Sequence, residues 1–269
     1  MPPPFERPMA RGDRGSDVAI MQRLLERAAP LVPENWGTYG ARTERAVDEL
    51  RKAHGLEPGN MDAPAARALL ECCAADRWRD DGTPAAARGL LFKLVVHTQA
   101  NRSAESSAVL LDGHNNQVHT FRARLHGVDA LHSEPQTWPS YSNTPGLTEL
   151  AADGNTPTGL FAADLNAPEP NATLYGPYPV LRLFQGLAGN ARFLTPAFRR
   201  GLLVHTGAWP GWKPGDPMPN SHGCVHASPD DVKRVWESLV ALGVAVRPNA
   251  GGAEPYPHPP QGLVAIVED

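Results

Sequence analysis

Residues 221–226 read Ser-His-Gly-Cys-Val-His, and the apolar stretch Leu202-Leu203-Val204 upstream leads directly into His205. The apolar stretch predicts a buried strand that carries His205 at its end. The segment between His205 and Ser221 is rich in Pro and Gly and is long enough to fold back. We therefore expect the second half of the chain to fold so that an imidazole and the thiol of Cys224 lie close together.

The pairing of a histidine with a cysteine suggests nucleophilic catalysis. A cysteine attacks a carbonyl as its thiolate, so it needs a partner that takes its proton. His205 is the candidate base, and Cys224 is the candidate nucleophile. Gly223 has no side chain, so a substrate carbonyl can approach the backbone there. The amides of Gly223 and Cys224 are then candidate donors to an oxyanion.

Spacing alone leaves two other interpretations open. His222, Cys224 and His226 alternate, so a strand would project them from one face, and with His205 they would form a His3Cys zinc set. Against a metal site, Gly223 and the Ser-Pro pair at 228–229 predict a turn into a helix, which would scatter these side chains. The remaining interpretation is that all of them are inert core residues.

Composition excludes several classes of protein. The chain has 269 residues, which allows one large or two modest domains. Its 25 Lys and Arg residues nearly balance 29 Asp and Glu residues and are scattered, which argues against nucleic acid as a partner. No apolar run reaches the roughly 18 residues of a membrane span. The first eight residues show no apolar signal-peptide core. The cysteine count is odd, which is compatible with a free thiol.

Helical periodicity marks the N-terminal part of the chain. Three short patterns follow one another, with apolar positions at Val18, Met21, Leu24 and Leu25, then Ala46, Val47 and Leu50, then Leu69 and Leu70. Ser16 or Asp17 begins the first pattern, Gly55 ends the second, and Asp62 begins the third. We expect a flexible leader at 1–11 and a three-helix domain at 12–73.

Beyond a charged, Ala-rich linker at 74–88, the period of the apolar residues changes to two. Strands are expected at 90–96, 109–111, 120–125, 175–183, 202–204 and 244–246. The second and third of these form a hairpin, and the prolines at 175–183 indicate an edge strand. Residues 127–153 read as a long loop containing Trp138 and Tyr141. A helix is expected at 230–242, capped by Ser228 with Pro229 at its first position.

The helical segment resembles the three-helix peptidoglycan-binding domain over residues 12–70. The similarity rests on Gly12-x-x-Gly15-x-Asp17-Val18-x-x-Met21-Gln22, on Gly37-x-Tyr39-Gly40-x-x-Thr43-x-x-Ala46-Val47, and on Gly55-Leu56 and Asp62. It departs from that family at Leu50-Arg51, where an aromatic residue and Gln are usual. The resemblance implies binding to peptidoglycan, and the alternative is a helical spacer that binds nothing.

The second half of the chain resembles the L,D-transpeptidase (YkuD-type) catalytic domain over about residues 88–248. The motif is His205-x15-Ser221-His222-Gly223-Cys224 followed by Val225, together with His205-Thr206-Gly207 and Thr156-Pro157-Thr158-Gly159. The resemblance implies an α+β chain: a three-helix domain, then a mainly-β, sandwich-like catalytic domain at 89–248 with a helix after Cys224, then a Pro/Gly-rich tail at 249–269.

The same resemblance implies the chemistry and the location. Cys224 would be acylated by a peptidoglycan stem tetrapeptide, with His205 as base and Gly223 as a backbone donor. The acyl group would pass to an amine or to water, with no metal and no cofactor, in the cell envelope, the periplasm or outside the cell. His222 would join Cys224, His205 and Gly223 in the catalytic set, and with Ser221 it would shape the pocket and stabilise the thiolate–imidazolium pair. The implied substrate-binding set is Ser221, His226, Thr206, Gly207, Thr156 and Thr158.

One residue departs from the family pattern, and two other functions compete with this one. His226 stands where the family usually has Arg or Asn, and histidine is charged only below about pH 6.5. The first alternative is a zinc-dependent peptidoglycan hydrolase that uses His205, His222, Cys224 and His226. The second is a wall-binding protein without catalysis.

Overall fold

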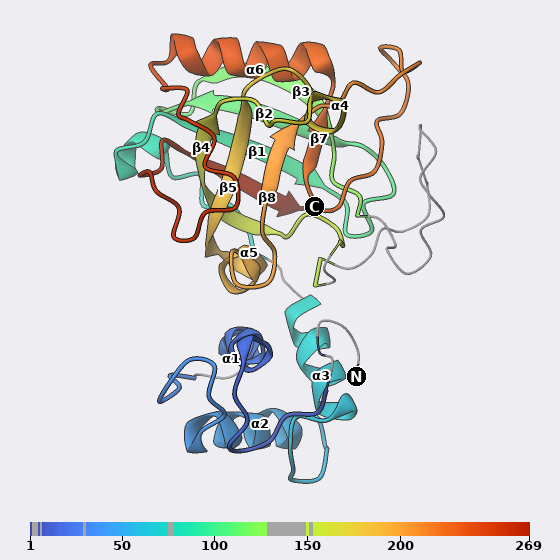
Figure 1. Ribbon diagram of the computed structural model, residues 1–269, viewed down its shortest axis with the longest axis vertical. Helices are drawn as coiled ribbons and strands as arrows, with labels where there is room; N and C mark the ends of the chain where they lie inside the picture. The colour runs from blue at the N-terminus through green and yellow to red at the C-terminus, as the bar shows by residue number, and fades with distance from the viewer. Residues whose placement is uncertain (2–4, 6, 29–30, 75–77, 128–148, 151–152) are drawn as a thin grey trace.

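The computed structural model describes residues 1, 5, 7–28, 31–74, 78–127, 149–150 and 153–269. These residues form a small helical body at the N-terminus and a larger β body (Figure 1). No helix in the described ranges is both long and apolar enough to cross a membrane. The expected order of a helical domain followed by a mainly-β domain is confirmed.

The helical body contains the three predicted helices, α1 (Ser16–Ala28), α2 (Ala41–Ala53) and α3 (Ala63–Ala74). Their apolar faces enclose one core, and Gln22 lies fully buried within it. Gln22 Nε2 donates to Thr43 Oγ1 and to Thr38 O, both at 2.9 Å, and Gly37 N–H donates to Gln22 Oε1 at 2.8 Å. A single amide thus holds the α1–α2 connection against both helices, because its donors and acceptor are all satisfied.

The expected flexible leader differs from what is observed. Phe5 and Met9 are buried in the helical core, and Met9 pairs with Met61 through two backbone hydrogen bonds of 3.0 Å. Burial of large apolar side chains outweighs the Pro-rich composition of the segment. The packed part of the helical domain therefore begins before residue 12.

The β body is a closed barrel of eight strands among the described residues, in the order β1-β2-β3-β7-β6-β5-β4-β8. The sheet closes on itself, where a sandwich-like packing was expected. The strands are β1 (Phe92–Thr98), β2 (Ser106–Asp112), β3 (Gln117–Arg124), β4 (Gly159–Asn166), β5 (Val180–Ala188), β6 (Leu202–His205), β7 (Val225–Ala227) and β8 (Gly262–Glu268). The shorter helices are the 3-10 helix η1 (Ala85–Arg88), α4 (Ala172–Tyr175) and α5 (Gly189–Leu194).

Helix α6 (Pro229–Ala241) follows β7 and covers one side of the barrel (Figure 1). Val232, Val235 and Leu239 pack into the main hydrophobic core. The predicted cap is present: Asp231 N–H donates to Ser228 Oγ at 3.1 Å, and Pro229 is the first helical residue. Only Ser228 separates the end of β7 from the start of α6, so the packing of the helix restrains the position of the strand.

Two strand expectations are wrong. β5 is no edge strand, because it pairs with β4 on one side and β6 on the other, and the prolines at 177 and 179 precede its first residue. Residues 244–246 form no strand. Ala245 N–H donates instead to the side chain of Gln261 at 2.8 Å.

The expected tail at 249–269 contains a strand of the barrel. β8 pairs in parallel with β1 and antiparallel with β4, so the β body extends to Glu268. The sequence of β8 shows no alternation of apolar and polar residues, because the strand is buried on both faces. The linker also departs from expectation, since Ala85 is buried and Asp80 pairs with Lys93 at 2.6 Å.

Most of the predicted long loop lies outside the described residues, including Trp138 and Tyr141. At its described end, Leu150 is buried in the helical core together with Leu194 of α5. Phe193 and Phe198 pack against the same core. The helical body and the β body are therefore joined by apolar contacts through α5.

We expect Ile266→Ala in β8 to lower the free energy of unfolding by about 2–5 kcal/mol, the cost of removing most of a fully buried isoleucine. Urea denaturation measures the change. The control is Val246→Ala, whose side chain is 42% exposed and should change stability little. Equal, small effects for both variants would contradict the placement of β8 in the barrel.

Candidate active site

Two short parallel strands hold the candidate site. In β6 and β7, Val204 lies opposite Val225 and His205 lies opposite His226. Val204 and Val225 belong to the barrel core, so the alternate residues face outward. Cys224 precedes β7 by one residue and, two positions before His226, shares this outer face.

Both histidines are covered although they lie on the outside of the barrel. His205 is 3% exposed and His226 is 7% exposed. Their rings meet edge to face, with centroids 4.7 Å apart. Tyr175 of α4 covers His205 at 5.0 Å, and Trp209 from the following loop covers His226 at 5.3 Å.

His205 is held as a neutral imidazole with one free nitrogen. Its Nδ1 lies 2.6 Å from Thr206 O. A carbonyl only accepts, so Nδ1 carries the proton and Nε2 keeps its lone pair. Burial lowers the pKa of His205 to about 4, against a weaker opposing effect of the Thr206 bond. At neutral pH His205 can accept a proton.

His226 is a second neutral imidazole. Its Nδ1 donates to Pro219 O at 2.9 Å. Burial, and then the neighbouring His205, lower the pKa of His226 to about 3. His226 therefore supplies shape and a polar edge beside His205, and no positive charge.

The Cys224 thiol is protonated at rest. Cys224 Sγ lies 3.6 Å from Gly201 O, to which it donates. Burial raises the pKa of Cys224 to about 11, although the Leu203 amide and the guanidinium groups of Arg199 and Arg182 act in the opposite direction. The thiol and His205 are thus a neutral pair, and the thiol must turn from Gly201 to reach the imidazole.

Hydroxyl groups fix the backbone around Cys224. Ser221 Oγ donates to Cys224 O at 2.7 Å, and Thr156 Oγ1 donates to the same carbonyl at 3.3 Å. Gly223 N–H donates to Ser221 Oγ at 3.1 Å. The Gly223 amide, expected as a donor to an oxyanion, is therefore already engaged within its own loop.

Gly223 occupies a position that only glycine fits. Its φ of +103° disfavours other residues, and a Cβ there would lie 1.8 Å from Arg199 Nη2. The space that a side chain would need is filled by the guanidinium of Arg199, so the glycine serves the packing of Arg199.

Arg199 is a part of the site that the sequence did not reveal. It is 1% exposed and donates through Nη1 to Glu149 O at 2.6 Å and through Nη2 to Gly154 O at 2.8 Å. Nη2 also lies 3.5 Å from His222 O. Burial lowers the pKa of Arg199 to about 10, so it stays charged at neutral pH. This cation ties the loop before Cys224 to Glu149, Gly154 and Asn155.

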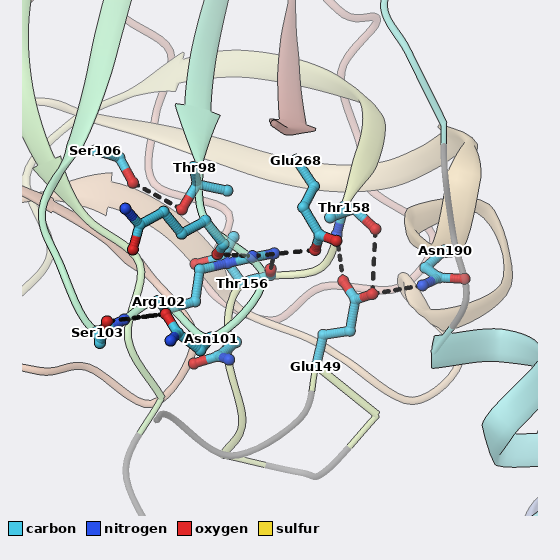
Figure 2. A network of polar contacts seen from close by, with 12 residues as sticks. Thr98, Asn101, Arg102, Ser103, Ser106, Glu149, Thr156, Thr158, Asn190 and Glu268 are labelled. Carbon is cyan, nitrogen blue, oxygen red and sulfur yellow. Dashed lines mark hydrogen bonds and ion pairs between the residues drawn. The ribbon is translucent and has the colours of Figure 1, made fainter. Parts of the chain in front are cut away.

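Thr156 and Thr158, two of the three threonines expected to bind substrate, are buried within polar contacts of the protein. Thr158 donates to the Glu149 carboxylate through its amide and through Oγ1, the latter at 3.1 Å, and Asn190 Nδ2 donates to the same group (Figure 2). Thr156 receives Arg102 Nη2 at its carbonyl at 3.5 Å. Both threonines lie behind the surface that a substrate would meet.

The remaining expected residues fall into two groups. Thr206 is fully buried, and Gly207 leaves room for the Trp209 indole, which would lie 2.2 Å from a Cβ at that position. His222 is exposed, and its Nδ1 pairs with Asp153 at 3.3 Å. His222 is therefore at the surface, while Thr206 and Gly207 are enclosed within the protein.

The alternative zinc set does not converge. His222 turns to Asp153, while His205 and His226 each donate Nδ1–H to a backbone carbonyl. Within the ranges that the structure describes, His, Cys, Asp and Glu side chains nowhere gather in threes in a way that could hold a metal ion.

Part of the chain that carries the candidate site matches a known protein family. Residues 132–247 match the YkuD family, described as the L,D-transpeptidase catalytic domain. No curated protein matches the chain. Among solved structures, an L,D-transpeptidase from Xylanimonas cellulosilytica is 19% identical, with 98% of this chain and 99% of that chain covered and a TM-score of 0.32. A fused Zn-dependent amidase/peptidase/peptidoglycan-binding domain-containing protein from Clostridium acetobutylicum is 14% identical over 97% and 99%, with a TM-score of 0.28.

We expect alkylation of Cys224 by iodoacetamide to accelerate about tenfold per pH unit from pH 7 to 10, because the thiolate fraction rises tenfold per unit below the pKa. A Cys72→Ser background removes the other partly accessible thiol. Peptide mass spectrometry gives the rate at Cys224. A plateau that begins near neutral pH would mean a preformed thiolate and contradict the neutral pair.

We expect Gly223→Ala to lower the free energy of unfolding by about 1–3 kcal/mol more than Gly215→Ala, the usual cost of overpacking. Both glycines have similar backbone angles, with φ of +103° and +102°, but a Cβ at Gly215 meets no atom within 4 Å. The difference between the variants in urea denaturation isolates the contact with Arg199. Equal losses would mean that backbone conformation alone selects Gly223.

Proposed function

We propose, from the premise that residues 132–247 form an L,D-transpeptidase catalytic domain of the YkuD family, that this chain is a cysteine-dependent acyltransferase acting on peptidoglycan stem peptides. The observation that carries the proposal is the outer face of β6 and β7. There the Cys224 thiol and the buried His205 imidazole lie on the same face of neighbouring strands, and the Nδ1 bond of His205 to a carbonyl leaves its Nε2 unprotonated.

The first half of the reaction makes a thioester. His205 Nε2 takes the thiol proton as Cys224 Sγ attacks the carbonyl carbon between the diamino acid and the terminal D-alanine. The oxyanion collapses, the C–N bond breaks, and His205 returns the proton to the leaving amine. Of the two expected oxyanion donors, the Cys224 amide is the one we retain, since Gly223 N–H is bonded to Ser221 Oγ.

The second half releases the acyl group. An acceptor amine attacks the thioester while His205 takes its proton, and the proton then returns to the departing sulfur. Water in place of the amine gives hydrolysis, as in an L,D-carboxypeptidase. Both outcomes use the same base, so the access of amine and water to the thioester decides between cross-linking and hydrolysis.

The neutral state of both histidines supports a mechanism in which proton transfer accompanies attack. A thiol with a pKa of about 11 and an imidazole with a pKa of about 4 do not exchange a proton at rest. His226 presents its ring edge to His205 and keeps the imidazole in place. At the position where the family usually has Arg or Asn, His226 is a positioning residue and does not act as a cation.

We assign the helical domain to binding of peptidoglycan. Its surface carries a cleft of about 260 Å³ lined by Leu31, Val32, Arg42, Arg45, Ala46 and Glu49, a mixture of charged and apolar groups that suits a sugar–peptide polymer. This attachment would hold the barrel near its substrate in the cell envelope. Retention of residues 1–74 on isolated sacculi tests the assignment if this segment folds alone, and the full chain with Arg45→Glu provides the matched comparison.

We expect incubation with a disaccharide-tetrapeptide, or with a carbapenem, to add the acyl mass to Cys224. Cys224→Ala should abolish the adduct, and His205→Ala should lower its rate of formation by about 10²–10⁴, the usual contribution of a general base. Intact-mass spectrometry measures both, and circular dichroism verifies folding. Full turnover by Cys224→Ala would overturn the proposal, while wall binding without any adduct would favour a non-catalytic protein.

A further inference from the structure

A small cavity lies beside the reactive thiol, at Gly201. Gly201 O accepts the Cys224 thiol at 3.6 Å, and Gly201 also lines a cavity of about 30 Å³. The cavity is lined mainly by β5, the segment 195–201 and the loop 251–256, with the polar side chains of Arg182, Thr195, Arg200, Glu254 and Tyr256 among its walls. Its volume exceeds the roughly 10–15 Å³ that one water needs, so a small polar group fits.

Thr195 is one of the residues that line this cavity, and its hydroxyl is unsatisfied. The residue is 3% exposed, and its Oγ1 is buried with no hydrogen-bond partner among the described residues. A buried hydroxyl without a partner costs free energy, which a bound acceptor would recover. None of the reaction steps above uses Thr195.

Arg182 also lines the cavity, and one of its terminal nitrogens has no hydrogen-bond partner among the described residues. The side chain is 5% exposed and is fixed by Nε, which donates to Asn166 Oδ1 at 2.9 Å, and by Nη2, which bonds Asn249 at 3.2 Å and pairs with Glu169. No described residue accepts a hydrogen bond from Nη1. Arg182 lies opposite Leu203 in β6, so it shares the outer face of the barrel with Cys224.

Arg200 adds a second guanidinium at the exposed rim. Its Nε donates to Pro196 O at 3.0 Å, which leaves both terminal nitrogens available. The charged residues that line the cavity are thus two arginines and one carboxylate, Glu254. Planar guanidinium donors suit a carboxylate, which accepts two parallel hydrogen bonds.

We propose that this cavity binds a free carboxylate of the peptide that acylates Cys224, with Arg182, Thr195 and Arg200 as its donors. The inference rests on the proposed function and names a subsite of that reaction. A carboxylate bound there lies on the Gly201 side of the thiol, so the peptide would run along the outer face of the barrel. Two sources share this chemistry: the terminal D-alanine, and an acidic group on the side chain of the diamino acid.

The test is binding to the full chain with Cys224→Ala, which separates recognition from turnover. Calorimetry compares the tetrapeptide with two analogues, one amidated at the terminal residue and one at the side-chain carboxylate. We expect one of the two amides to bind about tenfold more weakly, and that amide identifies the source. Equal affinity for all three peptides would overturn the inference.

Three variants in the same background assign the effect to the cavity. Arg200→Gln, at an exposed position, and Thr195→Val, which loses no hydrogen bond in the free protein, should each weaken binding of the acid about three- to tenfold. Neither should change binding of the amide that lacks the recognised group. Glu254→Gln should leave the acid bound as tightly or more tightly. Weaker binding of the acid to Glu254→Gln would show that the cavity recognises a positively charged group through Glu254. That result would also overturn the inference.

The two proposals fail in different ways. Acid-specific binding by Cys224→Ala without acylation of the wild-type chain would remove the proposed transpeptidation and retain the carboxylate subsite. Acylation of the wild-type chain, with no preference for an acid over its amide, would do the reverse. Thermal unfolding of Thr195→Val should occur at an unchanged or higher temperature, which separates a loss of ligand from a loss of fold.

Discussion

The parallel pairing of β6 with β7 is the constraint on which the site depends. Two strands of four and three residues share a register that sets His205 opposite His226. Val204 and Val225, which directly precede the two histidines, point into the barrel. Because side chains alternate along a strand, His205 and His226 must point outward. A shift of one residue in either strand would bury an imidazole in the apolar core and expose a valine. The core of the barrel therefore specifies the site as strictly as it specifies the fold.

Outward placement alone would give solvated histidines, and the loops change that. Tyr175 and Trp209 cover the two rings, and backbone carbonyls take up both Nδ1 protons. Each of these effects favours the uncharged form of its group. The resting site therefore contains a neutral thiol, Cys224, as proton donor and a neutral imidazole, His205, as proton acceptor. Charge then develops only when a carbonyl carbon is attacked.

The features that sequence predicted are those with a local cause. The three N-terminal helices, the Ser228 cap and the hairpin of β2 and β3 follow from periodicity and from turn residues within about ten positions. The motif around Cys224 also identified the nucleophile candidate and its base. The features that were missed depend on distant partners. Arg199 reads as one of two adjacent arginines, and only the fold sets it against Gly223 and Glu149. The family motif suggested that Thr158 binds substrate, yet its hydroxyl is bonded to Glu149, which also accepts a hydrogen bond from Asn190.

Closure of the barrel by β8 has a consequence for how the chain reaches its native state. β8 lies between β1 and β4, which are separated from it by more than 90 residues of sequence. Until residues 262–268 leave the ribosome, β1 and β4 each present an unpaired edge, and unpaired strand edges promote aggregation of nascent chains. The barrel can therefore close only after β8 has been synthesised, late in the order of its strands.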